Sequence, residues 1–413
     1  MQARKSLFIF THRQFLRLWL GQVTSQAGNK VYLMALAWWI LTTTPEHGGF
    51  ALGAFMVAGA LPSLMFCGFI GRVVDRMPPG KMLVACDLTS TALLVALGWA
   101  LRSGNLTLEF AYLAGFALAT VESFFNPAVT KCLPTLVPED SLEHAVAYQA
   151  STQYLASFGG SVLGAVLISW LGIPLLVSLT AVNYFISAMI ELTIDFPASS
   201  DDVLVDSAET ASENTDQTSA QELDWHKFPL LRLLLAGFGL VNFFATPILV
   251  VIPLYVQKSL HAEADILGWL EASLWIGILL GTFAAAIIKT DGRTIRMGAV
   301  SMVIYGLCLF IPGLFINFYA FALALFGAGV SLGVNNVKFV TLFQKVVPNE
   351  VKGRFFAAMQ AIISFSFPVA YLIFGYLGDI LPPDQVCLIQ GCGILLVAAW
   401  FYHLSRRESE LHS

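Results

Sequence analysis

Twelve apolar stretches, each long enough to cross a lipid bilayer, follow one another through this sequence. They lie near residues 15–42, 50–71, 83–101, 107–126, 145–171, 173–194, 231–257, 264–288, 297–316, 318–341, 355–378 and 385–403. A helix needs about 20 mostly apolar residues to cross about 30 Å of hydrocarbon. Because lipid offers the backbone no hydrogen-bond partner, each stretch must be helical. We therefore predict an all-α membrane protein with twelve transmembrane helices.

The composition excludes several classes of function. Hydrophobic residues make up 57% of the chain and the mean hydropathy is +0.74, against about 45–50% apolar residues in soluble domains. Little of the chain is left for a soluble domain, and no glycine-rich phosphate loop follows a strand. These features argue against an enzyme and against an ATP-driven pump. The six cysteines lack ligand-like spacing, so we expect no metal, no disulfide and no cofactor.

The positions of the basic residues predict the orientation in the membrane. If the N-terminus is cytoplasmic, only Arg102 and Lys258 fall outside, and Lys30 lies within the first span. All other Lys and Arg residues then lie on the cytoplasmic side or at helix ends facing it, as the positive-inside rule requires. We therefore expect both termini to be cytoplasmic.

A polar linker and an internal repeat divide the spans six and six. Residues 196–229 are rich in Ser, Thr, Asp and Glu and contain no Lys or Arg before Lys227, which is typical of a solvated linker. We predict an N-terminal six-helix bundle at 1–195, this cytoplasmic acidic linker, and a C-terminal six-helix bundle at 230–413.

The repeat joins two matching segments. Asn126 precedes Val137-Pro138, and Asn336 precedes Val347-Pro348 at the same spacing. Both segments run from the end of an even-numbered helix into the next helix. Parallel six-helix repeats are the organisation of one large class of transporters.

The link after the second span concentrates charge in an otherwise apolar region. Gly71-x-x-x-Asp75-Arg76, followed by Lys81, resembles the signature loop of the major facilitator superfamily. The resemblance implies a gating role for Gly71, Asp75, Arg76 and Lys81, although "MPPGK" departs from the usual ending of the loop. The alternative is that these charges only anchor the cytoplasmic side.

Three longer segments resemble the macrolide-efflux-like and enterobactin-exporter-like branch of that superfamily. They are "KMLVACDL" with Asp87, "NPAVTKCLPTLVPEDSLEHA" at 126–145, and "LFQKVVPNEVKGRFF" at 342–356, which contains Arg354. We expect Asp87 and Arg354 to act in gating. The resemblance implies two bundles related by a pseudo-two-fold axis along the membrane normal, in a monomer of the bacterial cytoplasmic (inner) membrane that contacts lipid, protons and a small-molecule substrate.

Polar side chains within the spans are costly unless they face a cavity or a partner. Within that superfamily, helices 1, 4, 7 and 10 line the central cavity, and the strongest interior polar groups here fall mainly on those helices. Gln22, Gln26 and Asn29 form one stripe on the first helix, with Lys30 beside it. We predict substrate contacts from Gln22, Gln26, Asn29, Lys30, Asn126, Gln149, Gln153, Asn242, Asn335, Asn336 and Lys338.

Two carboxylates are candidates for proton coupling. Lys30 and Glu122 lie at comparable depths, about 18 and about 24 Å from the outer ends of their helices, so we predict an ion pair between them, with Glu122 as the leading coupling group. The alternative is that Glu122 pairs with Lys131. Glu271 is either a second titrating group or an outer-gate partner of Lys258.

Three functions remain open. The first is a secondary exporter of amphipathic small molecules, drug-like or siderophore-like, that works by proton antiport with alternating access. The second is a facilitator or importer of a lipid-like metabolite or nutrient without proton exchange. Asn29 favours the second, because many relatives carry an acid at this position of the first helix. The third is a sensor or scaffold that keeps the fold without transport.

Overall fold

The computed structural model describes residues 12–138, 141–195, 229–288 and 293–406, and every long regular element within them is a helix. The helices are α2 (Arg13–Thr43), α3 (Gly48–Met65), α4 (Cys67–Arg76), α5 (Pro79–Arg102), α6 (Leu108–Leu136), α7 (Leu142–Glu191), α9 (Pro229–Ala245), α10 (Ile248–Lys258), α11 (Ala264–Ile287), α12 (Thr294–Leu314), α13 (Phe318–Val346), α14 (Asn349–Ile380) and α15 (Pro383–Leu404).

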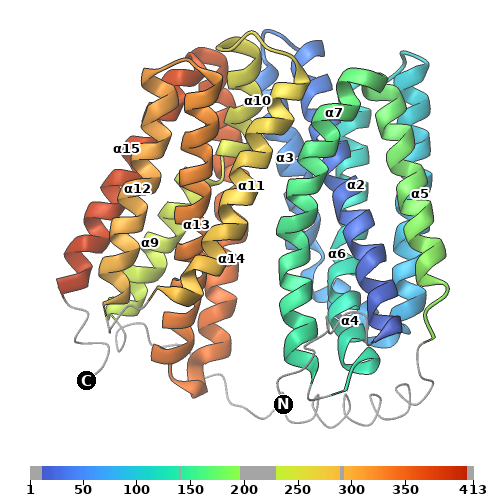
Figure 1. Cartoon of the computed structure of the whole chain (residues 1–413), viewed down its shortest axis with the longest axis horizontal. Helices are drawn as coiled ribbons and strands as arrows, with labels where there is room; N and C mark the ends of the chain where they lie inside the picture. Colours follow the sequence, from blue (N-terminus) through green and yellow to red (C-terminus); the bar gives the residue numbers. More distant parts are fainter. Residues whose placement is uncertain (1–11, 139–140, 196–228, 289–292, 407–413) are drawn as a thin grey trace, which may run out of the picture.

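These helices make twelve crossings within the described residues. Ten helical segments are long and apolar enough to span a membrane by composition alone. The long α7 turns back at Gly172, whose φ of 69° is a left-handed conformation that glycine adopts at little cost, so it supplies two crossings. The polar α2 is the remaining one, while α3 with α4 and α9 with α10 each form a single crossing (Figure 1). The predicted all-helical fold is confirmed.

Two details of the prediction were wrong. The stretches expected at 107–126 and 318–341 continue as helix to Leu136 and Val346, because the apolar pattern ends at the hydrocarbon edge while the backbone stays helical beyond it. The predicted signature loop is also mostly helical. Gly71, Asp75 and Arg76 belong to α4, which leaves only two residues, 77 and 78, between α4 and α5.

The helices group into two bundles, α2–α7 and α9–α15 (Figure 1). Between the bundles, α3 packs against α14 and α7 packs against α11. The second and eighth crossings correspond in the repeat, as do the fifth and eleventh, so a two-fold rotation exchanges these two contacts. Of the predicted 196–229 linker, only residue 229 is described.

The internal repeat ends equivalent helices in the same way. Val137 and Val347 follow the last residues of α6 and α13, both are buried, and each is followed by proline. Proline suits the entry to a new helix because its missing N–H is not needed there. The matched spacing seen in the sequence therefore marks matched corners of the two bundles.

The bundles touch most closely at the far end, which we define as the end where α2 finishes and α3 begins. A Cβ atom added to Gly49, Gly53 or Gly375 would strike backbone carbonyl groups of the opposite bundle. Asp379 of α14 accepts hydrogen bonds from the backbone N–H groups of Gly49 at 2.7 Å and Phe50 at 2.8 Å. An acid at the first turn of a helix satisfies free N–H groups and complements the helix dipole.

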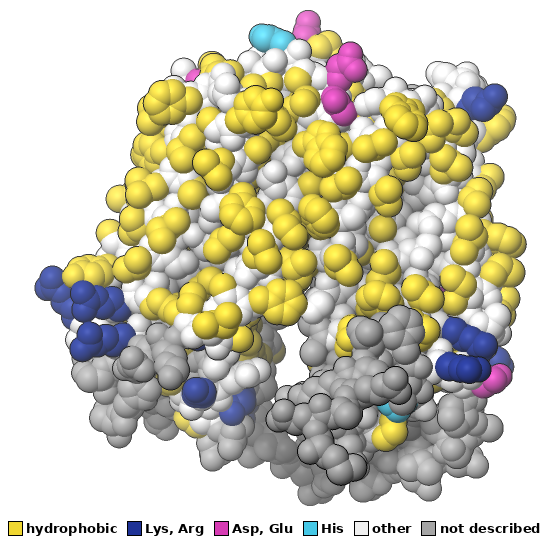
Figure 2. Space-filling model, in the orientation of Figure 1, with side chains coloured by type: hydrophobic (Ala, Val, Ile, Leu, Met, Phe, Trp, Pro, Cys, Tyr) yellow, Lys and Arg dark blue, Asp and Glu magenta, His cyan; other side chains and the backbone are white. Residues whose placement is uncertain are grey.

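The opposite end, where α2 begins and α15 finishes, is here called the terminal end. The bundles are joined from the middle of the molecule to the far end by hydrogen bonds at Gly49, Phe50, Ser161 and Gln257 and by the Lys30–Glu271 ion pair. A Cβ added to Gly71 or to Gly353 would meet nothing within 4 Å. The protein is therefore closed at the far end and open at the terminal end, which carries most of the Lys and Arg side chains visible in Figure 2.

We expect Gly53→Val to force the bundles apart at the far end. Overpacking costs about 1–3 kcal/mol, which corresponds to a shift of about fivefold to a hundredfold in the conformational equilibrium. A cysteine introduced at Ser259, in the far-end link after α10, should then react faster with a membrane-impermeant maleimide, in a background with Cys67 and Cys392 replaced. Gly59→Val on the same helix is the control, because its added Cβ would meet nothing within 4 Å. Equal rates in the two variants would contradict the close contact.

Candidate functional site

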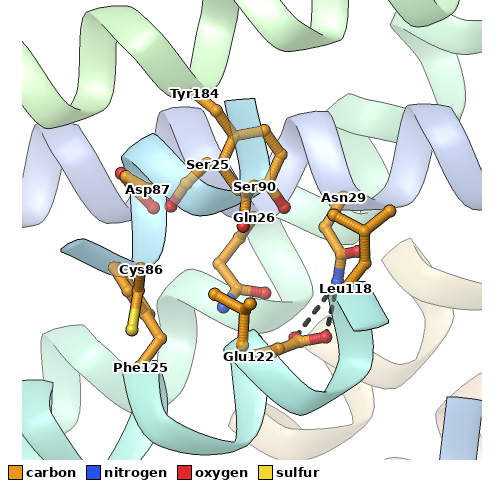
Figure 3. Close-up of a pocket in the computed structure, with 11 residues that line it drawn as sticks. Ser25, Gln26, Asn29, Cys86, Asp87, Ser90, Leu118, Glu122, Phe125 and Tyr184 are labelled. Carbon is orange, nitrogen blue, oxygen red and sulfur yellow. Dashed lines mark hydrogen bonds between the residues drawn. The ribbon is translucent and has the colours of Figure 1, made fainter. Parts of the chain in front are cut away.

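Glu122 of α6 lies opposite Asn29 of α2. The amide nitrogen of Asn29 donates to both carboxylate oxygens at 3.1 Å (Figure 3). Glu122 has no salt bridge among the described residues, so the predicted ion pair with Lys30 is wrong. The alternative pairing with Lys131 is also wrong, because that ammonium donates to backbone carbonyls at the end of α4.

Lys30 instead joins the two bundles. Its ammonium group lies 2.7 Å from Glu271 Oε2 of α11 and 5.4 Å from the ring centroid of Trp275. Ser161 of α7 donates to the same carboxylate oxygen at 3.2 Å. The side chains of the pair are only 12% and 5% exposed, so the ions interact in surroundings of low dielectric.

Helix geometry explains why comparable depth predicted the wrong partner for Lys30. Asn29 and Lys30 are consecutive, and consecutive side chains on a helix point about 100° apart. Asn29 therefore reaches α6, whereas Lys30 turns toward α7 and α11. Depth along the helix axis cannot distinguish these directions.

Lys258 is likewise not the partner of Glu271. Its ammonium group lies 3.6 Å from Asp379 and donates to the carbonyl of Gly378 at 2.8 Å. The two lysine pairs thus lie at two different depths in the molecule. Lys258 and Asp379 lie at the far end, and Lys30 and Glu271 lie nearer the middle.

Two cavities meet at Glu122. The larger, about 500 Å³, is open and lies between α3, α4 and α6, where Ser63, Gly71 and Asn126 also line it. The smaller is a polar chamber of about 20 Å³ inside the first bundle, enough for one water molecule. Gln26, Asn29 and Tyr184 line this chamber together with Glu122 (Figure 3). Glu122 is the residue that both cavities share.

The other predicted substrate contacts are more scattered. Gln22 is buried, Gln149 is half-buried and Gln153 is exposed on the first arm of α7. In the second bundle, Asn242 donates to the carbonyl of Phe238 on its own helix at 2.8 Å. Three predicted residues lie on α13: Asn335, which is buried with Oδ1 unpartnered; Asn336, which is half-buried; and Lys338, which donates to the Ile288 carbonyl at 2.6 Å.

The predicted gating residues separate into two groups. Gly71 lines the open cavity, and the side chains of Asp75, Arg76, Lys81 and Arg354 are exposed at the terminal end. Asp87, in contrast, is only 1% exposed and lines the small chamber. Asp87 is thus part of the bundle interior rather than of the terminal-end surface.

Two acidic residues were not predicted from the sequence: one lies at the contact between the bundles and one lies in the interior. Asp379 closes the far end, and Glu191, at the end of α7, is only 1% exposed. Each is a single acid close to the end of an apolar stretch, where a solvated position is the ordinary interpretation. The close approach of the helices at Gly49, Gly53 and Gly375 could not be predicted from residue spacing, because it joins distant parts of the chain.

Comparisons with known proteins agree on the family and the fold. A family model described as Major Facilitator Superfamily matches residues 18–371 and 233–413. Macrolide efflux protein A of Streptococcus pyogenes is 23% identical over 387 residues, covering 93% of this chain and 94% of that protein. The uncharacterized MFS-type transporter YkuC of Bacillus subtilis (strain 168) is 22% identical over 402 residues, covering 96% and 92%.

Solved structures with the same fold share little sequence. A point mutant of the nucleoside transporter NupG superposes with a TM-score of 0.70 at 13% identity, covering 95% of this chain and 99% of that one. A bacterial homologue of the iron transporter ferroportin in an inward-facing state superposes with a TM-score of 0.69 at 13% identity, covering 95% and 98%. At this identity the likeness concerns the fold alone.

We expect Lys30→Met to destabilise the contact between the bundles, because Glu271 would stay buried without its cation. Removing one partner of a buried ion pair costs about 3–5 kcal/mol. The double variant Lys30→Met/Glu271→Gln should recover most of this loss, which thermal unfolding of the purified protein would measure. Lys258→Met is the control and should cost less, because Asp379 keeps two backbone donors. A double variant as unstable as the single one would argue against a direct pair.

Proposed function

Because this chain belongs to the major facilitator superfamily, we propose that it exports amphipathic small molecules in exchange for protons, by alternating access of a central site. The fold is that of a transporter, and relatives that match most of the chain are named as efflux proteins. Drug-like and siderophore-like compounds are the proposed substrates. The proposed location is a bacterial cytoplasmic membrane, with the basic terminal end inside.

Glu122 is the observation that carries this proposal. It is a carboxylate in the wall of a large open cavity, and an amide rather than a cation holds it. An acid placed in this way can bind either a proton or the cationic group of a substrate, but not both. Competition for one carboxylate is the simplest chemical basis for exchange.

The Lys30–Glu271 pair has a different proposed role. It joins α2 of one bundle to α11 of the other, so it would separate if the bundles moved apart at the far end. Since Lys30 already neutralises Glu271, we assign Glu271 to this closure rather than to proton coupling. The Lys258–Asp379 contact with the start of α3 would separate in the same movement.

The energy available is sufficient for efflux. Each proton that enters across 100 mV supplies about 2.3 kcal/mol. At about 1.4 kcal/mol per factor of ten, this sustains a substrate gradient of roughly fiftyfold. One or two protons per cycle therefore serve the proposed exchange.

A facilitator or importer that does not exchange protons is the second candidate. Asn29 supports it, because the first helix offers an amide where many relatives carry an acid. The hydrogen bonds from Asn29 to Glu122 weaken this argument, since they bring an acid of α6 to the same place. Transport that an uncoupler leaves unchanged would favour this second candidate.

We expect Glu122→Gln to abolish proton-driven transport, because the amide cannot take up the proton, while substrate exchange continues at a raised substrate concentration, because the amide also binds a cation less well. Inverted vesicles with the wild-type protein should accumulate a fluorescent amphipathic cation when a proton gradient is imposed, and the variant should accumulate at least about tenfold less. Exchange of labelled for unlabelled compound, which needs no net proton movement, should continue. Glu109→Gln is the control, because Glu109 is exposed at the far-end start of α6.

Proton-driven accumulation by Glu122→Gln at the wild-type level would remove Glu122 from the coupling mechanism. In intact cells, expression of the wild-type protein should lower accumulation of the same dye, and an uncoupler should reverse that effect. A dye effect that persists with the uncoupler would contradict proton antiport.

A further inference from the structure

Two acids inside the first bundle form no salt bridge with a cation in the part of the chain that the structure describes. Asp87 of α5 and Glu191 of α7 are each only 1% exposed. Both oxygens of Glu191 and Oδ2 of Asp87 are buried without a hydrogen-bond partner. The two carboxylates lie close enough to interact electrostatically. Neither the Lys30–Glu271 closure nor the cavity wall at Glu122 uses them directly.

Two basic groups on helices of the same bundle are engaged elsewhere. On α2, Arg17 donates to the Thr193 carbonyl at 2.6 Å. On α6, Lys131 lies beside Cys132 and donates to the carbonyls of Val74 and Asp75, both at 2.9 Å. Within the described part of the chain, neither base forms a salt bridge with Asp87 or Glu191.

Several neighbours of the two acids within the described residues are uncharged groups. Cys86 on α5 and Cys132 on α6 lie near the two acids. On α7, Ser187 lies beside Asp87 and donates to the Gly21 carbonyl at 3.0 Å. These groups can pack around the acids or donate one hydrogen bond, but they cannot cancel two charges.

The position of Glu191 makes its charge still less favourable. It is the last residue of α7, and the last turn of that helix contains no basic residue. The C-terminus of a helix carries a partial negative charge, which repels a carboxylate. A buried like-charged pair at such a point needs a positive ion, since isolated buried charges cost several kcal/mol.

The small chamber connects this pair with the cavity wall. Asp87 lies at one side of the chamber and Glu122 at the other, with Gln26, Ser90 and Tyr184 around the space between them (Figure 3). The chamber holds about 20 Å³, which is room for a water molecule. Hydroxyl groups, amide groups and a water molecule arranged in series can relay a proton over short distances.

We propose that Asp87 and Glu191 form a buried site that binds one proton between them, exchanged with Glu122 through the small chamber. The neutral acid of Glu122 gives up its proton and becomes a carboxylate, while the pair changes from two negative charges to one. A proton fits this site better than a multivalent metal, because no group of three or more His, Cys, Asp and Glu gathers among the described residues. The use of this proton in transport rests on the proposed antiport, whereas its binding does not.

Infrared difference spectroscopy tests the binding directly. The full-length protein in lipid vesicles, without substrate, is stepped between acidic and alkaline pH in sodium and in choline buffers. In a Glu122→Gln background, which removes the band of that acid, we expect a protonated carboxyl band that shifts or is lost in Asp87→Asn and in Glu191→Gln alike, because one proton is shared. The exposed acid variant Glu109→Gln should keep the band. A band that neither substitution changes, or a site filled by sodium in place of the proton, would overturn the proposal.

Two further variants keep the test decisive. Glu122→Gln should retain the band at equilibrium but slow its appearance after a pH step by at least about tenfold. Gly21→Ala keeps every carboxyl group, yet the added Cβ would lie 3.6 Å from Glu191 Oε1, so it should shift the band if Asp87→Asn or Glu191→Gln does not fold. An unshifted band and an unchanged rate would contradict the site and its path.

The outcomes also separate this proposal from the proposed function. If Glu122→Gln abolishes proton-driven transport while Asp87→Asn leaves both transport and the carboxyl band unchanged, the antiport stands and the buried site fails. If the shared band is present but Glu122→Gln transports normally, the site stands and the proposed coupling fails.

Discussion

The structure depends on the rule that a charged group inside the membrane must find its partner within the protein. Lys30 shows the consequence most clearly. Its nearest acid, Glu271, belongs to the other bundle, so the ion pair that stabilises the lysine also fixes how the bundles meet. The same rule acts at the far end, where Asp379 satisfies N–H groups of α3 across the interface. The far end is therefore closed by contacts between the few polar groups whose burial without a partner would be unfavourable.

Much of the fold could be predicted because hydrophobic length is a strong signal in membranes. The apolar stretches placed all the crossings, and the repeated Val-Pro corners after Asn126 and Asn336 matched the two bundles. Helix ends were less accurate, because the backbone of α6 and α13 stays helical where the apolar pattern stops. The short link after Arg76 has the same cause, since charged residues continued α4 instead of forming a loop.

The candidate site was harder to predict than the fold. The sequence pointed to Glu122, Lys30 and Glu271 but to the wrong acid for Lys30, because residue spacing gives the depth of a side chain along its helix more readily than the direction in which it points. Glu191 escaped notice since an acid at the end of an apolar stretch normally reaches water. Only the packing of α2 and α5 against α7 reveals that it does not.

Each bundle also contains a lysine that donates hydrogen bonds to the backbone of a neighbouring helix. Lys131 of α6 binds carbonyls that end α4, and Lys338 of α13 binds the carbonyl of Ile288 that ends α11. These lysines occupy corresponding crossings, and their partners cannot gain or lose protons. These two lysine contacts therefore do not depend on the protonation of an acid, unlike the Asn29–Glu122 hydrogen bonds within the first bundle. A pair of helices held by such a contact stays together when nearby acids gain or lose protons, so each half keeps part of its shape if the two halves move as rigid bodies.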